Sequence, residues 1–178
     1  MSSVKTASVI ASESASRNPY ASFLGARNPM RVLTATPARL GKLIEGLTPR
    51  QIGRRPQPDK WSIAEVVAHL ADVELVYIAR CRWMLFEENP ALVPFNQDNW
   101  VQGWEREREP IAETLLRFQV LRRSLLRLLR SASPSDLART GRHVDYGTEQ
   151  VSDYVAKLAG HDLNHLIGIE SLRKLMLT

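Results

Sequence analysis

The segment from His161 to His165 holds the residue types and the spacing best suited to chemistry. Two histidines four residues apart lie on the same face of a helix, about one turn apart. Their imidazole nitrogens can bind one cation, and imidazole suits zinc, nickel, iron and copper. The same spacing is also found in pairs of hydrogen-bonded histidines at a helix interface, so the pair alone leaves both interpretations open.

A third histidine favours the metal interpretation. Like His161 and His165, His69 lies at the edge of the apolar stripe of a long predicted helix. Three histidine ligands from two neighbouring helices leave coordination positions for water or substrate, which is typical of catalytic rather than structural sites. The sequence assigns no role to the fourth histidine, His143.

Charged residues at predicted core positions are the next candidates. Asp162 projects from the centre of one apolar stripe, and Arg122 lies inside the apolar face of another helix. A buried charge is costly unless it is paired. Asp162 is therefore a candidate partner that orients a ligating histidine, and Arg122 and Arg80 are candidate contacts to an anionic substrate. Alternatively, Asp162 and Arg122 pair with each other, or with Glu74, inside the protein.

Four helices must position these residues, because apolar residues recur at helical spacing and no segment shows the alternation of a strand. Proline, glycine and serine separate the four predicted helical regions, which are 19–47, 61–87, 110–130 and 148–176.

Capping signals predict where the helices begin. Ser62 and Glu65 form a capping box at the second helix. Thr36 followed by Pro37 predicts a fresh start inside the first region, because threonine caps helices and proline suits their first position. Thr148 is the predicted N-cap of the fourth helix.

The polar connection at 88–109 is long for a compact domain. Its length can span the second helix, about 37 Å, so the connection can act as a crossover. The second and third helices can then run parallel instead of forming a hairpin.

Composition limits the remaining possibilities. The chain has 178 residues, of which 44% are hydrophobic, and this predicts one globular domain over 18–178. Residues 1–17, rich in serine and alanine, are expected to form a mobile tail. The single cysteine, Cys81, rules out an internal disulfide and a cysteine-based zinc finger. No apolar run is long enough for a membrane span, so a cytoplasmic location is expected.

The net charge of +5 is concentrated between Arg106 and Arg142, where nine arginines face four acidic residues. A basic stretch can attract nucleic acid. No aromatic or glycine-rich RNA motif and no helix-turn-helix pattern accompanies it. A solvated helix face is therefore the expected role, and nucleic acid is not an expected partner.

Two segments together resemble a known family. The run from Pro58 to Glu74 resembles the KWS-x-x-E-V-x-x-HL-x-D-x-E segment of the DinB/YfiT-like superfamily. The run from His161 to Leu166 resembles the HD-x-x-HL segment of the same family. The resemblance covers about 18–176, with both segments in the family's order.

The resemblance implies an all-α four-helix bundle with up-down-down-up topology. It also implies a divalent metal, nickel or zinc most often, held by His69, His161 and His165. Some relatives are transferases or isomerases that use a low-molecular-weight thiol, and others are similar to amidohydrolases. No motif in this chain distinguishes between these reactions.

The sequence thus predicts a metal-dependent enzyme that acts on a small-molecule substrate, as a thiol-dependent S-transferase or as a hydrolase. The bound metal would act as a Lewis acid or activate a water or thiol. A homodimer is compatible with a bundle of this kind. The alternative hypothesis is a non-enzymatic bundle that serves stress-response binding or protein interaction.

Overall fold

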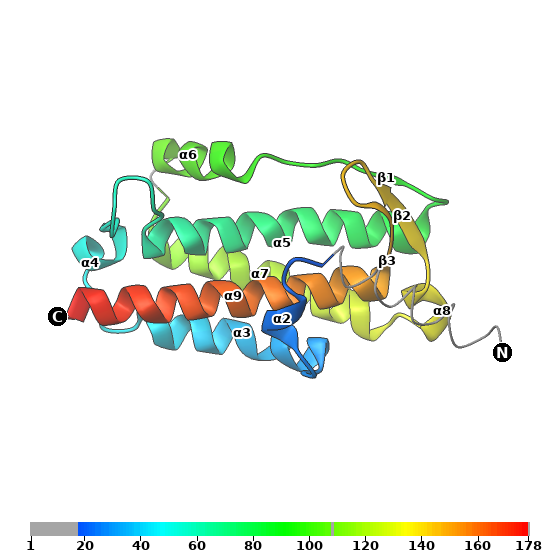
Figure 1. Cartoon of the computed structure of the whole chain (residues 1–178), viewed down its shortest axis with the longest axis horizontal. Coiled ribbons are helices and arrows are strands. Elements are labelled where there is room, and N and C mark those ends of the chain that lie inside the picture. The colour runs from blue at the N-terminus through cyan, green and yellow to red at the C-terminus, as the bar shows by residue number, and fades with distance from the viewer. Residues whose placement is uncertain (1–17, 108, 178) are drawn as a thin grey trace.

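The body of the protein is a bundle of four long helices. The computed structural model describes residues 18–107 and 109–177, so the predicted tail at 1–17 lies outside the described residues. Figure 1 shows α5 and α7 running away from the end that holds α4, and α3 and α9 running toward it. The four long helices are α3 (Pro29–Ile44), α5 (Ile63–Phe86), α7 (Ile111–Arg130) and α9 (Val151–Leu177).

Short helices and strands connect and flank the four long helices. In the described part of the chain, four of these short elements are helical: α2 (Ala21–Leu24), α4 (Pro49–Gly53), α6 (Gln97–Glu107) and α8 (Pro134–Leu137). Three are strands: β1 (Ala91–Leu92), β2 (Thr140–His143) and β3 (Gly147–Gln150). Both β1 and α6 lie in the predicted crossover, and α6 packs against α5. The length of this connection thus accommodates two elements of its own.

The small sheet corrects the prediction that the chain has no strands. Strands β2 and β3 pair antiparallel, and β1 pairs parallel with β2 in the order β1-β2-β3. Gly147 closes the hairpin with φ +72°, a conformation that glycine adopts readily. Strands of two to four residues are too short for an alternating pattern to appear, so sequence periodicity could not reveal them.

The start of α5 confirms the predicted capping box. The Ser62 Oγ accepts the N–H of Glu65 at 3.3 Å, and the Glu65 Oε2 accepts the N–H of Ser62 at 2.7 Å. The predicted cap at Thr148 is wrong. Thr148 lies in β3 opposite Arg142, and α9 begins directly after that strand at Val151.

The predicted fresh start at Thr36 is also wrong, because α3 runs through this point from Pro29. Asn28 caps the helix by accepting the N–H of Arg31. The Thr36 hydroxyl donates to the Val32 carbonyl at 3.0 Å, as a threonine inside a helix does. Proline inside a helix leaves one carbonyl, four residues earlier, without its usual donor.

That carbonyl belongs to Leu33, four residues before Pro37. The Arg122 Nη1 of α7 donates to the Leu33 carbonyl at 2.9 Å. A side chain from a neighbouring helix therefore satisfies the acceptor that Pro37 leaves open. This replacement explains why α3 continues past a residue that usually ends a helix.

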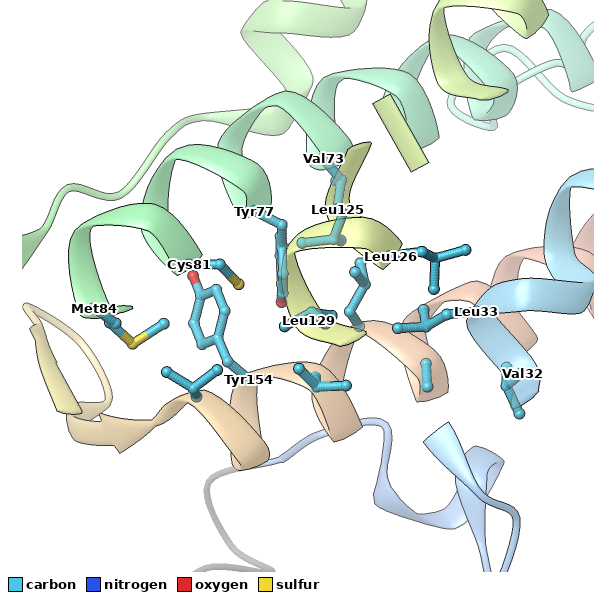
Figure 2. Packing of buried hydrophobic residues seen from close by; sticks show 14 of the residues in the cluster. Val32, Leu33, Val73, Tyr77, Cys81, Met84, Leu125, Leu126, Leu129 and Tyr154 are labelled. Carbon is cyan, nitrogen blue, oxygen red and sulfur yellow. The ribbon is translucent and has the colours of Figure 1, made fainter. Parts of the chain in front are cut away.

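Aliphatic and aromatic side chains from all four long helices form the main core. In Figure 2, Leu33 from α3, Tyr77 from α5, Leu125 from α7 and Tyr154 from α9 converge on one space. The rings of Tyr77 and Tyr154 lie 4.4 Å apart between their centroids. Cys81 is buried in this cluster as a free thiol. Among the described residues, no helix is long and apolar enough to cross a membrane.

Gly160 lets α2 approach α9 closely. A Cβ atom placed on Gly160 would lie 2.5 Å from the carbonyl oxygen of Tyr20 and 2.8 Å from its Cβ. The backbone at Tyr20 could not stay in place against such an atom. Because Gly160 has no side chain, Tyr20 can pack directly against α9.

We expect Gly160→Ala to lower the free energy of unfolding by about 1–3 kcal/mol, the usual cost of overpacking. The matched control is Gly168→Ala in the same helix, where a Cβ would meet nothing within 4 Å. Because alanine favours helix by about 1 kcal/mol over glycine, the control should be neutral or stabilising. Urea unfolding of both variants measures the difference, and equal effects would contradict the close approach.

Candidate metal centre

Two facing helices carry the residues around the candidate site. His69, Tyr77 and Arg80 of α5 recur at helical spacing, and so do Tyr154, Lys157 and His161 of α9, so each set lies on one face of its helix. All six line one cavity. Because the helices run in opposite directions (Figure 1), His69 meets His161 at one end and Arg80 meets Tyr154 at the other.

The three predicted histidines come together, with their Nε2 atoms facing one another. The Nε2 of His161 lies 3.0 Å from that of His69 and 3.1 Å from that of His165. A tetrahedral metal with bonds of about 2.0–2.1 Å places its ligand nitrogens about 3.4 Å apart. The observed separations are close to that value. The separations of His161 from the other two histidines are therefore close to those of nitrogens that share one metal.

Burial keeps these imidazoles neutral. Burial first, and the nearby His165 second, lower the pKa of His69 to about 3. Burial also lowers the pKa of His165 to about 4, and holds the pKa of His161 well below its usual value. Neutral imidazole is the form that binds a metal. Each ring thus has a lone pair available at ordinary pH.

The cluster leaves polar atoms that the described residues do not satisfy. The Nδ1 atoms of His69 and His161 are buried without a hydrogen-bond partner. If Nδ1 carries the proton of each ring, the Nε2 lone pairs face one another and repel. A cation between the Nε2 atoms removes this repulsion, so three neutral nitrogen donors fit a zinc or nickel ion.

Aromatic rings pack around the histidines and limit their movement. The Tyr20 ring meets the His161 ring edge-on, with centroids 5.1 Å apart. The Trp61 ring lies 5.0 Å from the His69 ring. His165 also borders a second depression, which it shares with Trp61. Aromatic side chains therefore pack around the histidines, and two separate depressions border the cluster.

Asp162 and Arg122 pair inside the bundle, as the alternative prediction stated. The guanidinium of Arg122 donates to Asp162 at 2.7 and 3.2 Å and to Glu74 at 2.6 Å. All three side chains are fully buried. Burial raises the pKa of Glu74, and the Arg122 charge opposes this shift.

This pairing is the alternative that the sequence left open for both residues. The Asp162 carboxylate faces Arg122, so the structure does not show it orienting a histidine. Arg122 is fully buried and does not line the cavity, so it has no free face for a substrate. Arg80 does line the cavity, and its contact with a substrate stays a prediction.

The cavity contains residues to which the sequence assigned no role. His143 from β2, Tyr20 from the start of α2, and the buried pair of Lys157 and Glu149 also line it. Lys157 gave a usable signal, because it lies between Tyr154 and His161 on one helix face. His143 and Glu149 gave none, since they come from a hairpin that the sequence did not predict.

Known proteins resemble this chain along most of its length. Relatives from Oceanobacillus iheyensis and Bacillus cereus strain AH820 are each 28% identical over 138 residues, or 78% of this chain. The match covers 80% and 79% of those proteins, which are provisionally named as metal-dependent hydrolases.

A solved structure also matches the fold. YfiT from Bacillus subtilis, described as a probable metal-dependent hydrolase with an unusual four-helix bundle topology, superposes with a TM-score of 0.77 at 25% identity. The match covers 83% of this chain and 85% of that one. The family model of the DinB superfamily matches residues 33–168, a span that includes all three clustered histidines. Since that match extends over more than half of the sequence, the resemblance is confirmed: the chain belongs to the DinB superfamily.

Proposed function

We propose that this protein is a metal-dependent hydrolase of small molecules, with a divalent ion, nickel or zinc, held by His69, His161 and His165. The observation that carries the proposal is the convergence of three neutral histidines, which each place a ring nitrogen within 4.8 Å of the others. The names of the relatives support the same class of reaction.

The chain's own residues would divide the work as follows. The three histidines would hold the ion and leave coordination positions open, as three-histidine catalytic sites do. Such an ion polarises a carbonyl or phosphoryl oxygen and lowers the pKa of a bound water. Both His69 and His161 line the cavity, so a substrate entering there would reach the ion.

The size of the cavity indicates the size of the substrate. Its volume is about 190 Å³. Pockets for drug-sized ligands enclose roughly 300–1,000 Å³. We therefore expect a compact substrate with few atoms.

A thiol-dependent S-transferase would use the same open coordination positions of the metal, with a low-molecular-weight thiol in place of water as the nucleophile.

The first experiment measures metal content. The full chain, purified without a histidine tag and incubated with nickel or zinc, should retain about one equivalent after gel filtration. His161→Ala/His165→Ala should lose the metal and keep its helical circular dichroism. His143→Ala is the matched control, because this histidine lies outside the cluster and should leave the stoichiometry unchanged. Absence of metal from all three proteins would reject the proposal and favour a non-enzymatic bundle.

The second experiment assigns the reaction. Metal-loaded protein is incubated with small esters and amides, with and without a low-molecular-weight thiol. Hydrolysis that needs the metal and no thiol is the expected result. Consumption of an electrophile only in the presence of thiol would overturn hydrolysis in favour of S-transfer.

A further inference from the structure

Arg80 is a second buried arginine, and among the described residues no acidic side chain pairs with its charge. It is only 5% exposed and lines the cavity beside the histidines. Its guanidinium donates to the Tyr154 hydroxyl and to the Val93 carbonyl, which are both uncharged acceptors. Its Nε has no hydrogen-bond partner. Within residues 18–107 and 109–177, no carboxylate forms an ion pair with it.

Arg122, the other buried arginine, has a structural role and provides the comparison. Two buried carboxylates, from Glu74 and Asp162, contact its guanidinium. Burying a charge without a counter-charge is unfavourable, even when neutral groups accept its hydrogen bonds. The buried Arg80 charge lacks such a partner, but it lies at a cavity where a ligand can supply the missing negative charge.

The other charged groups at the cavity do not supply it. Lys157 and Glu149 are both buried and pair with each other, so their charges cancel. The Asp145 side chain is 64% exposed and lies 3.9 Å from the Nδ1 of His143. Water therefore screens its carboxylate. The buried part of the cavity wall carries one net positive charge, to which a divalent ion on neutral histidines would add.

We propose that the Arg80 end of the cavity binds an anionic group of the substrate, a carboxylate or a phosphate, while the reacting bond lies at the three histidines. This inference rests on the proposed function for the placement of the reacting bond. Arginine suits the role because its planar guanidinium binds carboxylate and phosphate through several N–H donors. Two contacts to neutral acceptors are described, so further N–H donors remain for a ligand.

A second donor lies at the same end. The Nδ1 of His143 accepts the N–H of Asp145 at 3.1 Å, so in the neutral ring the proton is on Nε2. His143 lines the cavity and is available as a donor to an anion. The rise along α5 from His69 to Arg80 is about 16 Å, so the anionic group and the reacting bond would lie at opposite ends of the ligand.

Isothermal titration calorimetry tests the subsite with three probes: succinate, inorganic phosphate and the neutral diamide of succinate. Wild-type protein should bind at least one of the anions more tightly than the diamide. Arg80→Gln should raise the Kd for that anion by at least about tenfold, the loss expected for a charged hydrogen bond. Arg139→Gln is the matched control, because Arg139 also donates to backbone carbonyls at this end, of Met84 and Glu87.

The anions can also bind a metal directly, so each titration is repeated in metal-free His161→Ala/His165→Ala. Arg80-dependent binding that persists there supports the subsite, even if the metal experiment has rejected the proposed function. Binding that disappears in the histidine variant and is unchanged in Arg80→Gln would overturn the subsite. Equal affinity for anions and diamide would also overturn it. The stronger of succinate and phosphate identifies the anionic group.

Discussion

Replacing Arg122 with methionine should lower the free energy of unfolding by about 3–5 kcal/mol, the usual loss when one partner of a buried ion pair is removed. Methionine is apolar and matches the aliphatic stem of arginine, so the packing of that stem is retained. The loss comes from Glu74 and Asp162, which would remain buried without their guanidinium. The Leu33 carbonyl would lose its donor as well.

Chemical unfolding followed by circular dichroism measures this effect. Arg123→Met is the matched control, since Arg123 is the next residue of α7 and is exposed. Its effect should stay within about 0.5 kcal/mol. Glu74→Gln keeps the contact between Arg122 and Asp162 and should cost less than Arg122→Met. If Arg122→Met does not fold, the Glu74→Gln result still tests the network. Equal stability of the Arg122 and Arg123 variants would contradict it.

Lowering the pH from 7.5 to 5 should destabilise the metal-free protein through its histidine cluster. The unfolded chain binds protons at its histidines with a pKa near 6.5. The folded chain resists these protons, because the pKa of His69 is about 3 and that of His165 about 4. The stabilisation is therefore complete above pH 6.5 and is lost progressively as the pH falls toward the folded values. At pH 5 the loss is about 2 kcal/mol for each histidine.

The comparison that isolates this effect is with His69→Gln/His161→Gln/His165→Gln. Both proteins share all other titrating groups, including His143 and the carboxylates. As the pH falls from 7.5 to 5, the free energy of unfolding of the wild type should decrease more than that of the triple variant. Urea titrations at several pH values, with a chelator present, provide the measurement. Parallel curves would show that the folded histidines titrate normally.

The sequence was sufficient to predict the long helices and the histidine cluster. A capping box marks α5 clearly because both of its partners lie within four residues. His161 and His165 share a helix face by spacing alone. His69 could be added to them because it had the same position on the edge of an apolar stripe.

The features that sequence reasoning missed depend on contacts between distant segments. The strands were too short for a pattern, and β1 pairs with β2 across 51 positions of the chain. Helix α3 continues through Pro37, and the carbonyl that this proline leaves without a donor is bonded by Arg122 from another helix. The periodicity placed Arg122 and Asp162 in the core, but only the packed bundle decides that they contact each other instead of a ligand or a histidine.

The contact between Arg122 and Leu33 also has a consequence for how this sequence can vary. Pro37 creates an acceptor that only an outside donor can satisfy, and Arg122 is that donor. Loss of Arg122 leaves the Leu33 carbonyl without a donor. If another residue replaces Pro37, its own N–H can donate to that carbonyl, and the bond from Arg122 is no longer needed. Substitutions at these two positions should therefore not be independent. Among descendants of this sequence, the identities of residues 37 and 122 should covary, although 85 positions separate them along the chain.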